Sequence, residues 1–223
     1  MPNKKIIYFI VFLLVLIQNS FCSKQGVKMK LPEPIFTGKV SVEQAILNRR
    51  SVRFYEDQAL TIEQVSQLLW AAQGKTADWG GRTVPSAGAT YPLEIYLVVG
   101  NVQGIDAGVY HYLGQTHELV KLSVGDKRKE LANAAWGQKY IELAPVNIVI
   151  AIKYERTTGR YGNRGMRYAD NEVGHCGQNI HLQAEALGLG TVVIGAFQDS
   201  LVMSALGIKE EPAYIMPVGK KKD

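Results

Sequence analysis

Residues 85–99 read Pro85-Ser-Ala-Gly-Ala-Thr-Tyr-Pro-Leu-Glu-Ile-Tyr-Leu-Val-Val99, a loop that runs directly into an apolar segment. The second half, from Leu93 onward, is rich in branched and aromatic residues and predicts a buried strand. The first half ends a stretch rich in Gly, Thr, Ser and Pro that begins at Lys75. Loops of this length are usually functional or disordered. Small residues would let its backbone approach a flat ligand closely, although an ordinary surface loop remains the alternative.

Two helices are predicted on the N-terminal side of this loop. One begins at Ser41 and the other at Thr61, because each of these residues is followed three positions later by Gln, as in a capping box. Val42, Ala45 and Ile46 lie on one face of the first helix. Apolar residues recur at helical spacing along the second, and Gly74 is its expected C-cap.

The chain beyond Val99 predicts further strands and helices. They are a hairpin of 108–113 and 118–122, a helix over 126–141, a strand over 145–154, a long helix over 164–187, a strand over 191–197, a helix over 199–206 and a strand over 214–218. Helices and strands are interspersed without strict alternation, which favours an α+β fold over a doubly wound sheet. Neither an internal repeat nor a shift in composition divides the chain into two domains.

A cationic segment, Arg49-Arg50-Ser51-Val52-Arg53, follows the first helix. Three guanidinium groups so close together repel one another unless an anion or an acidic partner offsets their charge. Guanidinium forks match phosphate oxygens, and the hydroxyl of Ser51 adds a neutral donor. The segment therefore indicates a phosphate site, with a solvated basic face as the alternative.

Two segments near the C-terminus are further candidates for ligand contacts. The run Gly188-Leu-Gly-Thr-Val-Val-Ile-Gly195 is not a dinucleotide fingerprint, since its order is helix, turn, strand rather than strand, turn, helix. Gly195 would still let a ligand approach the backbone. Lys220 and Lys221 directly follow the last predicted strand, which would hold them near a phosphate. The four histidines lack the spacing of metal ligands, so no metal site is predicted.

These segments, in this order, resemble the nitroreductase family of flavoproteins, and in particular its SagB-type dehydrogenase branch. The resemblance covers residues 40–223 and rests on five motifs. They are Arg49-Arg-Ser-Val-Arg53, Pro85-Ser-Ala-Gly-Ala-Thr-Tyr-Pro-Leu-Glu94, Gly108-Val-Tyr-His-Tyr112 with Thr116-His-Glu-Leu119, Gly174-His-Cys-Gly-Gln-Asn179, and Ala186-Leu-Gly-Leu-Gly190 with Gly195-Ala-Phe197.

The resemblance implies a mostly antiparallel central sheet flanked by helices, in an intertwined homodimer with FMN at the interface. Arg49 and Ser51 would bind the FMN phosphate with Arg50 beside them, and Arg53 would lie at the edge of the flavin ring where negative charge accumulates. Its other implied contacts are Pro85, Ser86, Ala87 and Gly88 of the partner subunit, the backbone of Ile194 and Gly195, and Lys220 and Lys221 at the phosphate.

The implied activity is an FMN-dependent oxidoreductase that transfers hydride through flavin N5 in a ping-pong cycle. NADH or NADPH is a possible donor, a small molecule is the other substrate, and no protein residue is assigned a catalytic role. Two alternatives stay open: a SagB-type dehydrogenase that oxidises a peptide-derived heterocycle, and a non-catalytic exported flavin-binding protein. Ala89 stands where many relatives carry an Asn, and Ile194 stands where some carry an acidic residue. The surfaces that meet the hydride donor and acceptor are therefore expected to differ from those of nitroaromatic reductases.

Composition and the N-terminus bear on location. The 223 residues are 47% apolar and 20% charged with a net charge of +5, too mild a balance to indicate a nucleic-acid partner. Residues 1–22 have a positive start and an apolar run, and they predict a signal peptide. We therefore expect a periplasmic or extracytoplasmic protein that meets a membrane only through an uncleaved leader. Residues 23–39 are expected to be extended, and Cys176 to be a buried small residue.

Overall fold

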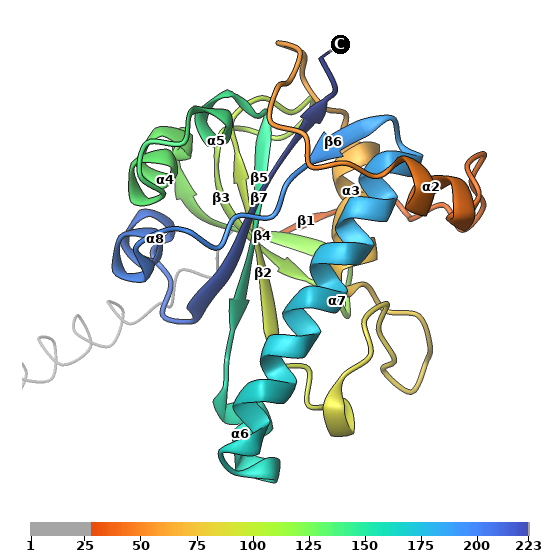
Figure 1. Cartoon of the computed structure of the whole chain (residues 1–223), viewed down its shortest axis with the longest axis vertical. Helices are drawn as coiled ribbons and strands as arrows, with labels where there is room; N and C mark the ends of the chain where they lie inside the picture. Colours follow the sequence, from red (N-terminus) through yellow and green to blue (C-terminus); the bar gives the residue numbers. More distant parts are fainter. Residues whose placement is uncertain (1–27, 223) are drawn as a thin grey trace, which may run out of the picture.

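The computed structural model describes residues 28–222. The predicted signal peptide, residues 1–22, lies outside the described residues, as do residues 23–27 of the N-terminal segment. The strands form one sheet in the order β1-β4-β3-β2-β5-β7-β6, and every pair of neighbours is antiparallel (Figure 1). The α+β class and the antiparallel sheet flanked by helices are therefore confirmed.

Alternation along β2 explains the two layers of helices. The strands are β1 (Lys28–Lys30), β2 (Leu93–Val99), β3 (Gly108–Leu113), β4 (Glu118–Val124), β5 (Val146–Ile152), β6 (Leu189–Thr191) and β7 (Glu211–Lys220). Ile95 and Leu97 point into one core, whereas Tyr96 and Val98 point into the other. Successive side chains of a strand face opposite sides, so a strand covered on both faces is apolar throughout.

Helices cover both faces of this sheet. They are α2 (Val42–Asn48), α3 (Ile62–Gln73), α4 (Arg128–Ala134), α5 (Lys139–Leu143), α6 (Glu155–Tyr161), α7 (Arg164–Ala186) and α8 (Asp199–Leu206), with a short 3₁₀ turn, η1 (Ala87–Ala89). Helices α3 and α7 pack on the face with Ile95, and α4 and α8 pack on the opposite face. The short α6 was not predicted, and α7 runs for 23 residues across the sheet (Figure 1).

The predicted capping boxes are present at both early helices. The side chains of Ser41 and Thr61 each accept the backbone N–H three residues later, and the Gln side chain there accepts the cap N–H. Gly74 ends α3 as predicted, but in an extended conformation. A Cβ atom there would lie 2.2 Å from the Trp70 ring and 2.8 Å from its carbonyl oxygen, so only glycine fits.

The predicted helix over 126–141 is wrong as a single element. It is divided into α4 and α5 because Trp136 and Gly137 adopt φ values of 59° and 75°, which are outside the range of a right-handed helix. The N–H of Gly137 instead returns to the carbonyl of Ala132. Sequence periodicity did not predict this break, since apolar residues continue on both sides of it.

The predicted strand over 191–197 is also corrected, because β6 covers only Leu189–Thr191. The register with β7 continues as far as Ile194, which exchanges both backbone hydrogen bonds with Ile215 at 2.9 and 3.0 Å. Between these points Val192 faces Pro217, which has no N–H to donate. The ladder is interrupted there, and the chain then turns away to α8.

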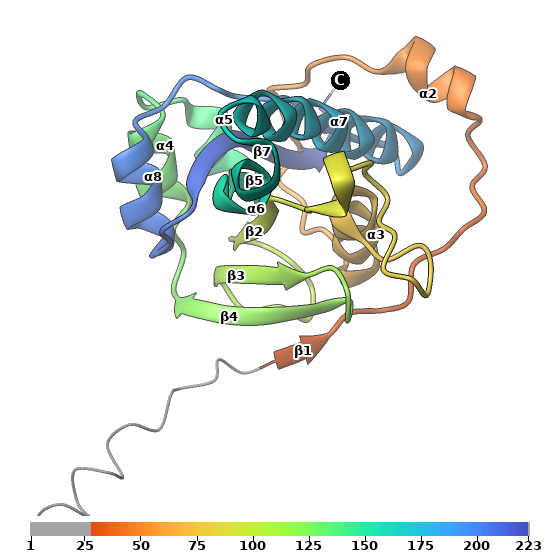
Figure 2. The same cartoon turned by 90° about the horizontal axis from the view of Figure 1, so that it is seen from below.

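Helix α2 lies at the edge of the molecule (Figure 2), and several of its apolar residues are exposed. Ala45 is buried, but the side chains of Val42, Ile46 and Leu47 are 65%, 56% and 70% exposed. Of the face predicted from the sequence, only Ala45 is covered by residues 28–222. Within residues 28–222 no helix is long and apolar enough to span a membrane.

Candidate functional site

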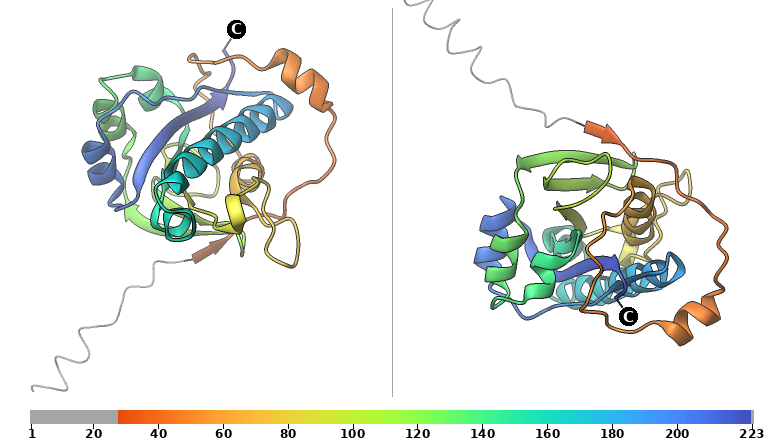
Figure 3. Two further views of the ribbon diagram at one scale, coloured as in Figure 1. Left: turned by 60° about the horizontal axis from the view of Figure 1, so that its bottom comes forward. Right: turned by 90° about the horizontal axis from the view of Figure 1, so that it is seen from above.

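The cationic segment is fixed between two strand ends that lie far away in the sequence. Val52 donates its N–H to the carbonyl of Thr191 in β6 at 2.9 Å, and Glu56 donates to Lys220 in β7 at 3.0 Å. Lys222 closes the arrangement by donating to the carbonyl of Phe54 at 3.2 Å. The C-terminus and the segment after α2 consequently lie side by side in both views of Figure 3. The structure thus brings together the two groups of residues assigned to a phosphate.

The three arginines of this segment keep their positive charge uncompensated. Among residues 28–222, none of Arg49, Arg50 and Arg53 forms an ion pair with a carboxylate. Arg50 donates to two backbone carbonyls, including its neighbour's at 2.8 Å, and the Cζ atom of Arg53 lies 5.9 Å from the centre of the Tyr140 ring. Ser51 is exposed beside them.

Arg49 is close enough to His181, in the C-terminal half of α7, to act on it electrostatically. Burial, together with the positive charge of Arg49, lowers the pKa of His181 to about 4. His181 is therefore neutral at physiological pH and adds no repulsion to the cluster. An uncharged imidazole is compatible with an anion held by the neighbouring guanidinium.

The two lysines assigned to the phosphate are already paired. Lys220 lies 2.9 Å from a carboxylate oxygen of Glu56, and Lys221 lies 2.6 Å from one of Glu185. Both are therefore near the arginines, as predicted, but a phosphate would have to compete with these carboxylates for them. The arginines are the more available cations of the site.

Ile194 and Gly195, whose backbones are expected to contact the flavin ring, differ in exposure and in backbone hydrogen bonding. Ile194 is 5% exposed, and its N–H and C=O groups are both taken by Ile215. Gly195 is exposed, and its backbone groups make no hydrogen bond with other described residues. The bridge to β7 thus leaves Gly195, rather than Ile194, able to present backbone groups to a ligand.

The loop of Pro85 to Gly88 is held by a buried carboxylate of α7. Oε1 of Glu172 accepts the Ser86 hydroxyl and the Ala87 N–H, both at 3.0 Å, while Ser86 Oγ accepts the N–H of Tyr91 at 2.8 Å. Gly88 has a φ of 59°, which suits the glycine found there. Pro85 and Gly88 are exposed at the loop surface. Glu172 was not among the predicted site residues, and only its position on the inner face of α7 could have indicated it.

Replacing Glu172 with Gln should change how stability depends on pH. Burial raises the pKa of Glu172, against the opposing effect of the Ala87 and Ser86 hydrogen bonds. The folded state therefore holds the proton more tightly than the unfolded chain, and this contribution to stability is present at low pH and lost as the pH rises through the folded pKa. Glu172→Gln keeps a hydrogen-bond acceptor but carries no charge at any pH. The Tm of the variant minus the Tm of wild type should therefore become more positive from pH 5 to pH 8. An equal Tm difference at both pH values would contradict this.

The two halves of the predicted site do not meet within one chain. Glu172, which holds the loop, and Glu185, which pairs with Lys221, are 13 residues apart on α7. At 1.5 Å per residue they are about 20 Å apart along the helix. Figure 1 shows the yellow loop containing η1 on one side of α7 and the segment leading from β6 to α8 on the other. A ligand held by the arginines therefore does not rest on this loop of its own chain.

Close packing behind the cationic segment gives a direct test of its attachment. A Cβ atom on Gly190 would lie 2.6–2.8 Å from the Cβ and both methyl carbons of Val52, whose position is fixed by its bond to Thr191. We expect Gly190→Ala to destabilise the fold by about 1–3 kcal/mol through overpacking. Gly159→Ala is the control: a Cβ there meets open space in α6, and the change should stabilise by about 0.5–1 kcal/mol. Equal Tm values for the two variants would disprove this packing.

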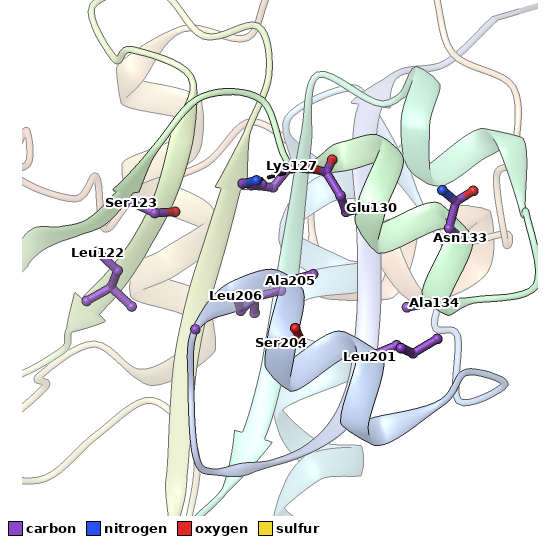
Figure 4. Close-up of a pocket in the computed structure, with 11 residues that line it drawn as sticks. Leu122, Ser123, Lys127, Glu130, Asn133, Ala134, Leu201, Ser204, Ala205 and Leu206 are labelled. Atoms are coloured by element: carbon purple, nitrogen blue, oxygen red, sulfur yellow. Dashed lines mark hydrogen bonds and ion pairs between the residues drawn. The ribbon is translucent and has the colours of Figure 1, made fainter.

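A separate hollow of about 520 Å³ lies between α4, α8 and β4 (Figure 4). Lys127 and Glu130 point toward one another at its rim, 2.9 Å apart, and Leu122 and Leu201 supply apolar surface. None of the predicted site residues lines it, so it is not part of the site. Within residues 28–222 no group of His, Cys, Asp and Glu is arranged to hold a metal ion. Cys176 is fully buried and donates to the carbonyl of Ala72, as expected of a structural residue.

Comparison with known proteins agrees with the motifs. The model of the nitroreductase family matches residues 46–220. A Methanocaldococcus jannaschii protein whose name describes it as a nitroreductase is 49% identical over 183 residues, which cover 82% of this chain and 92% of that protein. The microcin B17-processing protein McbC of Escherichia coli is 29% identical over 71% of this chain and 61% of its own length. A crystal structure from Anabaena variabilis, also described as a nitroreductase, superposes with a TM-score of 0.78 at 30% identity, over 88% of this chain and 42% of that one.

Proposed function

Because the chain belongs to the nitroreductase family and is an oxidoreductase of that family, we propose that it binds FMN through its cationic segment and catalyses hydride transfer to a small molecule. The observation that carries this proposal is the pairing of the Arg49–Arg53 segment with β6 and β7. This pairing gathers the arginines, Ser51, Lys220 and Lys221 at one end of α7. No other cationic cluster among the described residues includes so many predicted site residues.

The chemistry of these residues fits the proposed cofactor. Arginine side chains without a carboxylate partner, beside an exposed hydroxyl, suit a phosphate dianion. Gly195 offers uncommitted backbone groups and no side chain, which suits a flat ring approaching from solvent. When bound, FMN would supply two-electron hydride transfer through N5, in a ping-pong cycle between NADH or NADPH and an acceptor.

Each residue of the chain has a distinct part in this proposal. Arg49 and Ser51 bind the phosphate, Arg50 adds positive charge beside them, and Lys220 and Lys221 approach it from β7. Arg53, beside Tyr140, provides a fixed cation that would favour a negatively charged ring. Pro85 to Gly88 exclude water from the ring without supplying an acid or a base.

A homodimer would complete the site. The loop of Pro85 to Gly88 is about 20 Å along α7 from the phosphate residues of the same chain, so a second chain is proposed to supply it. The exposed apolar face of α2, with Val42, Ile46 and Leu47, supports such an assembly, since apolar patches of this kind mark interaction surfaces.

Steady-state kinetics would test the proposed activity. The FMN-loaded protein should oxidise NADH or NADPH with an added quinone or nitroaromatic acceptor, and double-reciprocal plots at several acceptor concentrations should be parallel, as in a ping-pong cycle. Loading with FMN but no turnover with either nucleotide would support the non-catalytic flavin-binding alternative.

A second substrate class is favoured by the likeness to McbC, which is a microcin-processing protein. In this version a thiazoline or oxazoline derived from a peptide is the hydride donor, and the product is the aromatic heterocycle. A synthetic thiazoline peptide that reduces the bound flavin under anaerobic conditions, where NADH does not, would favour this alternative.

The proposed location rests on the sequence of residues 1–22. We propose that this leader directs export, so that the protein works outside the cytoplasm. Fractionation of cells that make the full chain, followed by mass determination of the N-terminus, would distinguish a cleaved leader from a retained anchor and from a cytoplasmic protein.

A further inference from the structure

A second polar cavity, remote from the cationic segment, lies beside β2 and the β3–β4 hairpin. Its volume is about 460 Å³, and none of the residues assigned to FMN lines it. Arg82, Glu94, Arg156 and His111 line it, together with the amide of Gln73 and the phenols of Tyr91 and Tyr112. Apolar surface comes from Leu93, Ile95 and Leu113, while other lining residues, Thr90, Gln115 and Thr116, are polar.

Two buried hydrogen-bond donors of this cavity have no acceptor. Gln73 is 2% exposed, and its Oε1 accepts Nη1 of Arg82 at 3.2 Å. Its Nε2 has no partner within residues 28–222, and neither has Nε of Arg82. Buried donors are almost always satisfied in folded proteins, because an unpaired one loses the hydrogen bonds it made with water. Both atoms have almost no accessible surface, so they lie just behind the cavity wall, and an acceptor would meet them only after the Gln73 and Arg82 side chains turn toward the cavity.

The charges of the cavity leave one cation uncompensated. Glu94 uses one carboxylate oxygen for His111, at 2.6 Å, and the other for Arg156. Arg156 also donates to the carbonyl of Tyr91 at 2.8 Å. Arg82 has no ion-pair partner among the described residues, and its guanidinium lies 4.5 Å from the centre of the Tyr91 ring.

The guanidinium of Arg82 remains charged in this setting. Burial lowers the pKa of Arg82, and the nearby carboxylate of Glu94 acts in the opposite direction. An arginine starts from a pKa above 12, so it stays protonated at physiological pH. With Glu94 balancing Arg156, the cavity carries a net positive charge.

We propose that this cavity binds the carboxylate of a small organic monoanion. Nη1 of Arg82 faces Gln73 and Nε is buried, so Nη2 is the guanidinium nitrogen left for a carboxylate, and a small rotation of the side chain would add Nε as the second donor of a bidentate pair. The apolar part of the wall would cover the body of the ligand. A single uncompensated cation suits one negative charge better than the two of a phosphate. This site goes beyond the proposed FMN chemistry and does not depend on it.

Benzoate is a suitable probe, with neutral benzamide and inorganic phosphate as comparisons. The full-length protein is titrated with each compound while the Nε–Hε signals of its arginines are followed by NMR. Benzoate should shift the Arg82 signal in a saturable manner, whereas benzamide and phosphate should leave it at least tenfold less affected at the same concentration.

Two substitutions separate recognition from folding. Gln73→Glu is nearly the same size but places a carboxylate beside Arg82, and Arg82→Lys keeps the charge but removes the fork. Each should weaken benzoate binding at least tenfold by calorimetry, while Arg167→Lys, an exposed arginine on α7, should not change it. Cooperative melting of each variant shows that it is folded.

Several results would overturn the proposal. The first is an Arg82 signal that does not move when benzoate is added. The second is binding of benzamide or phosphate as tightly as benzoate. The third is equal benzoate affinity in wild type and Gln73→Glu. The first result would mean that no anion pairs with the guanidinium of Arg82. FMN loading of the same samples is measured in parallel, so a failure of this site is distinguishable from a failure of the proposed function.

Discussion

A protein carrying Arg49→Ala together with Ser51→Ala should be purified without FMN and should take up added FMN at least about 100-fold more weakly than wild type. A hydrogen bond to a charged group contributes about 1.5–3 kcal/mol, so losing two corresponds to about 3–6 kcal/mol. Since about 1.4 kcal/mol is a tenfold change in affinity, the loss spans two orders of magnitude or more. Fluorescence titration with FMN measures it directly.

The control for this experiment removes the same chemical groups elsewhere. Arg167 and Ser200 are both exposed, on α7 and α8, and neither belongs to the proposed site. Arg167→Ala with Ser200→Ala should bind FMN like wild type. If the Arg49 and Ser51 variant stays fully loaded while its Tm is unchanged, the phosphate assignment is wrong.

Two inactive variants should restore each other when they form a mixed dimer. Gly88→Val disturbs the loop, because a Cβ there would lie 2.5 Å from the Tyr161 hydroxyl oxygen at a φ of 59° that valine disfavours. Homodimers of this variant, and of the Arg49→Ala, Ser51→Ala variant, should each lack FMN. In a mixed dimer one site combines the intact arginines of one chain with the intact loop of the other.

Differently tagged chains allow the mixed dimer to be isolated from cells that express both variants. The expected result is one FMN per mixed dimer, whereas a mixed dimer that remains empty would show that the site is not shared between chains. Mixed dimers of wild type and either variant serve as controls and should also retain one FMN. Monomers in solution would contradict the proposed assembly outright.

Local sequence signals predicted most of the elements. Strand β2 was predicted with its observed bounds because an apolar run covered on both faces has few other interpretations, and α3 was predicted because its cap and its periodicity agree. The division into α4 and α5 was missed, because positive φ values at Trp136 and Gly137 leave no periodic trace. The interruption of β6 depends on Pro217, more than twenty residues away, so only the register reveals it.

The candidate site was predictable in composition but not in arrangement. The cationic segment could be recognised from its charge, yet nothing local says that Val52 pairs with Thr191 or that Lys220 and Lys221 are already paired with carboxylates. Glu172 was not assigned to the site, because nothing local distinguishes a buried polar residue that holds a distant loop from one that pairs within its own helix. The distance between the arginines and the loop along α7 follows only from the assembled fold.

The guanidinium groups beside Ser51 are proposed to hold the phosphate of FMN. The most direct measurement is the visible absorption spectrum of the purified full-length protein, recorded before and after addition of FMN and removal of the unbound excess. We expect flavin bands that correspond to one FMN per chain and that persist through gel filtration. A colourless protein that releases all added FMN on the same column would contradict it.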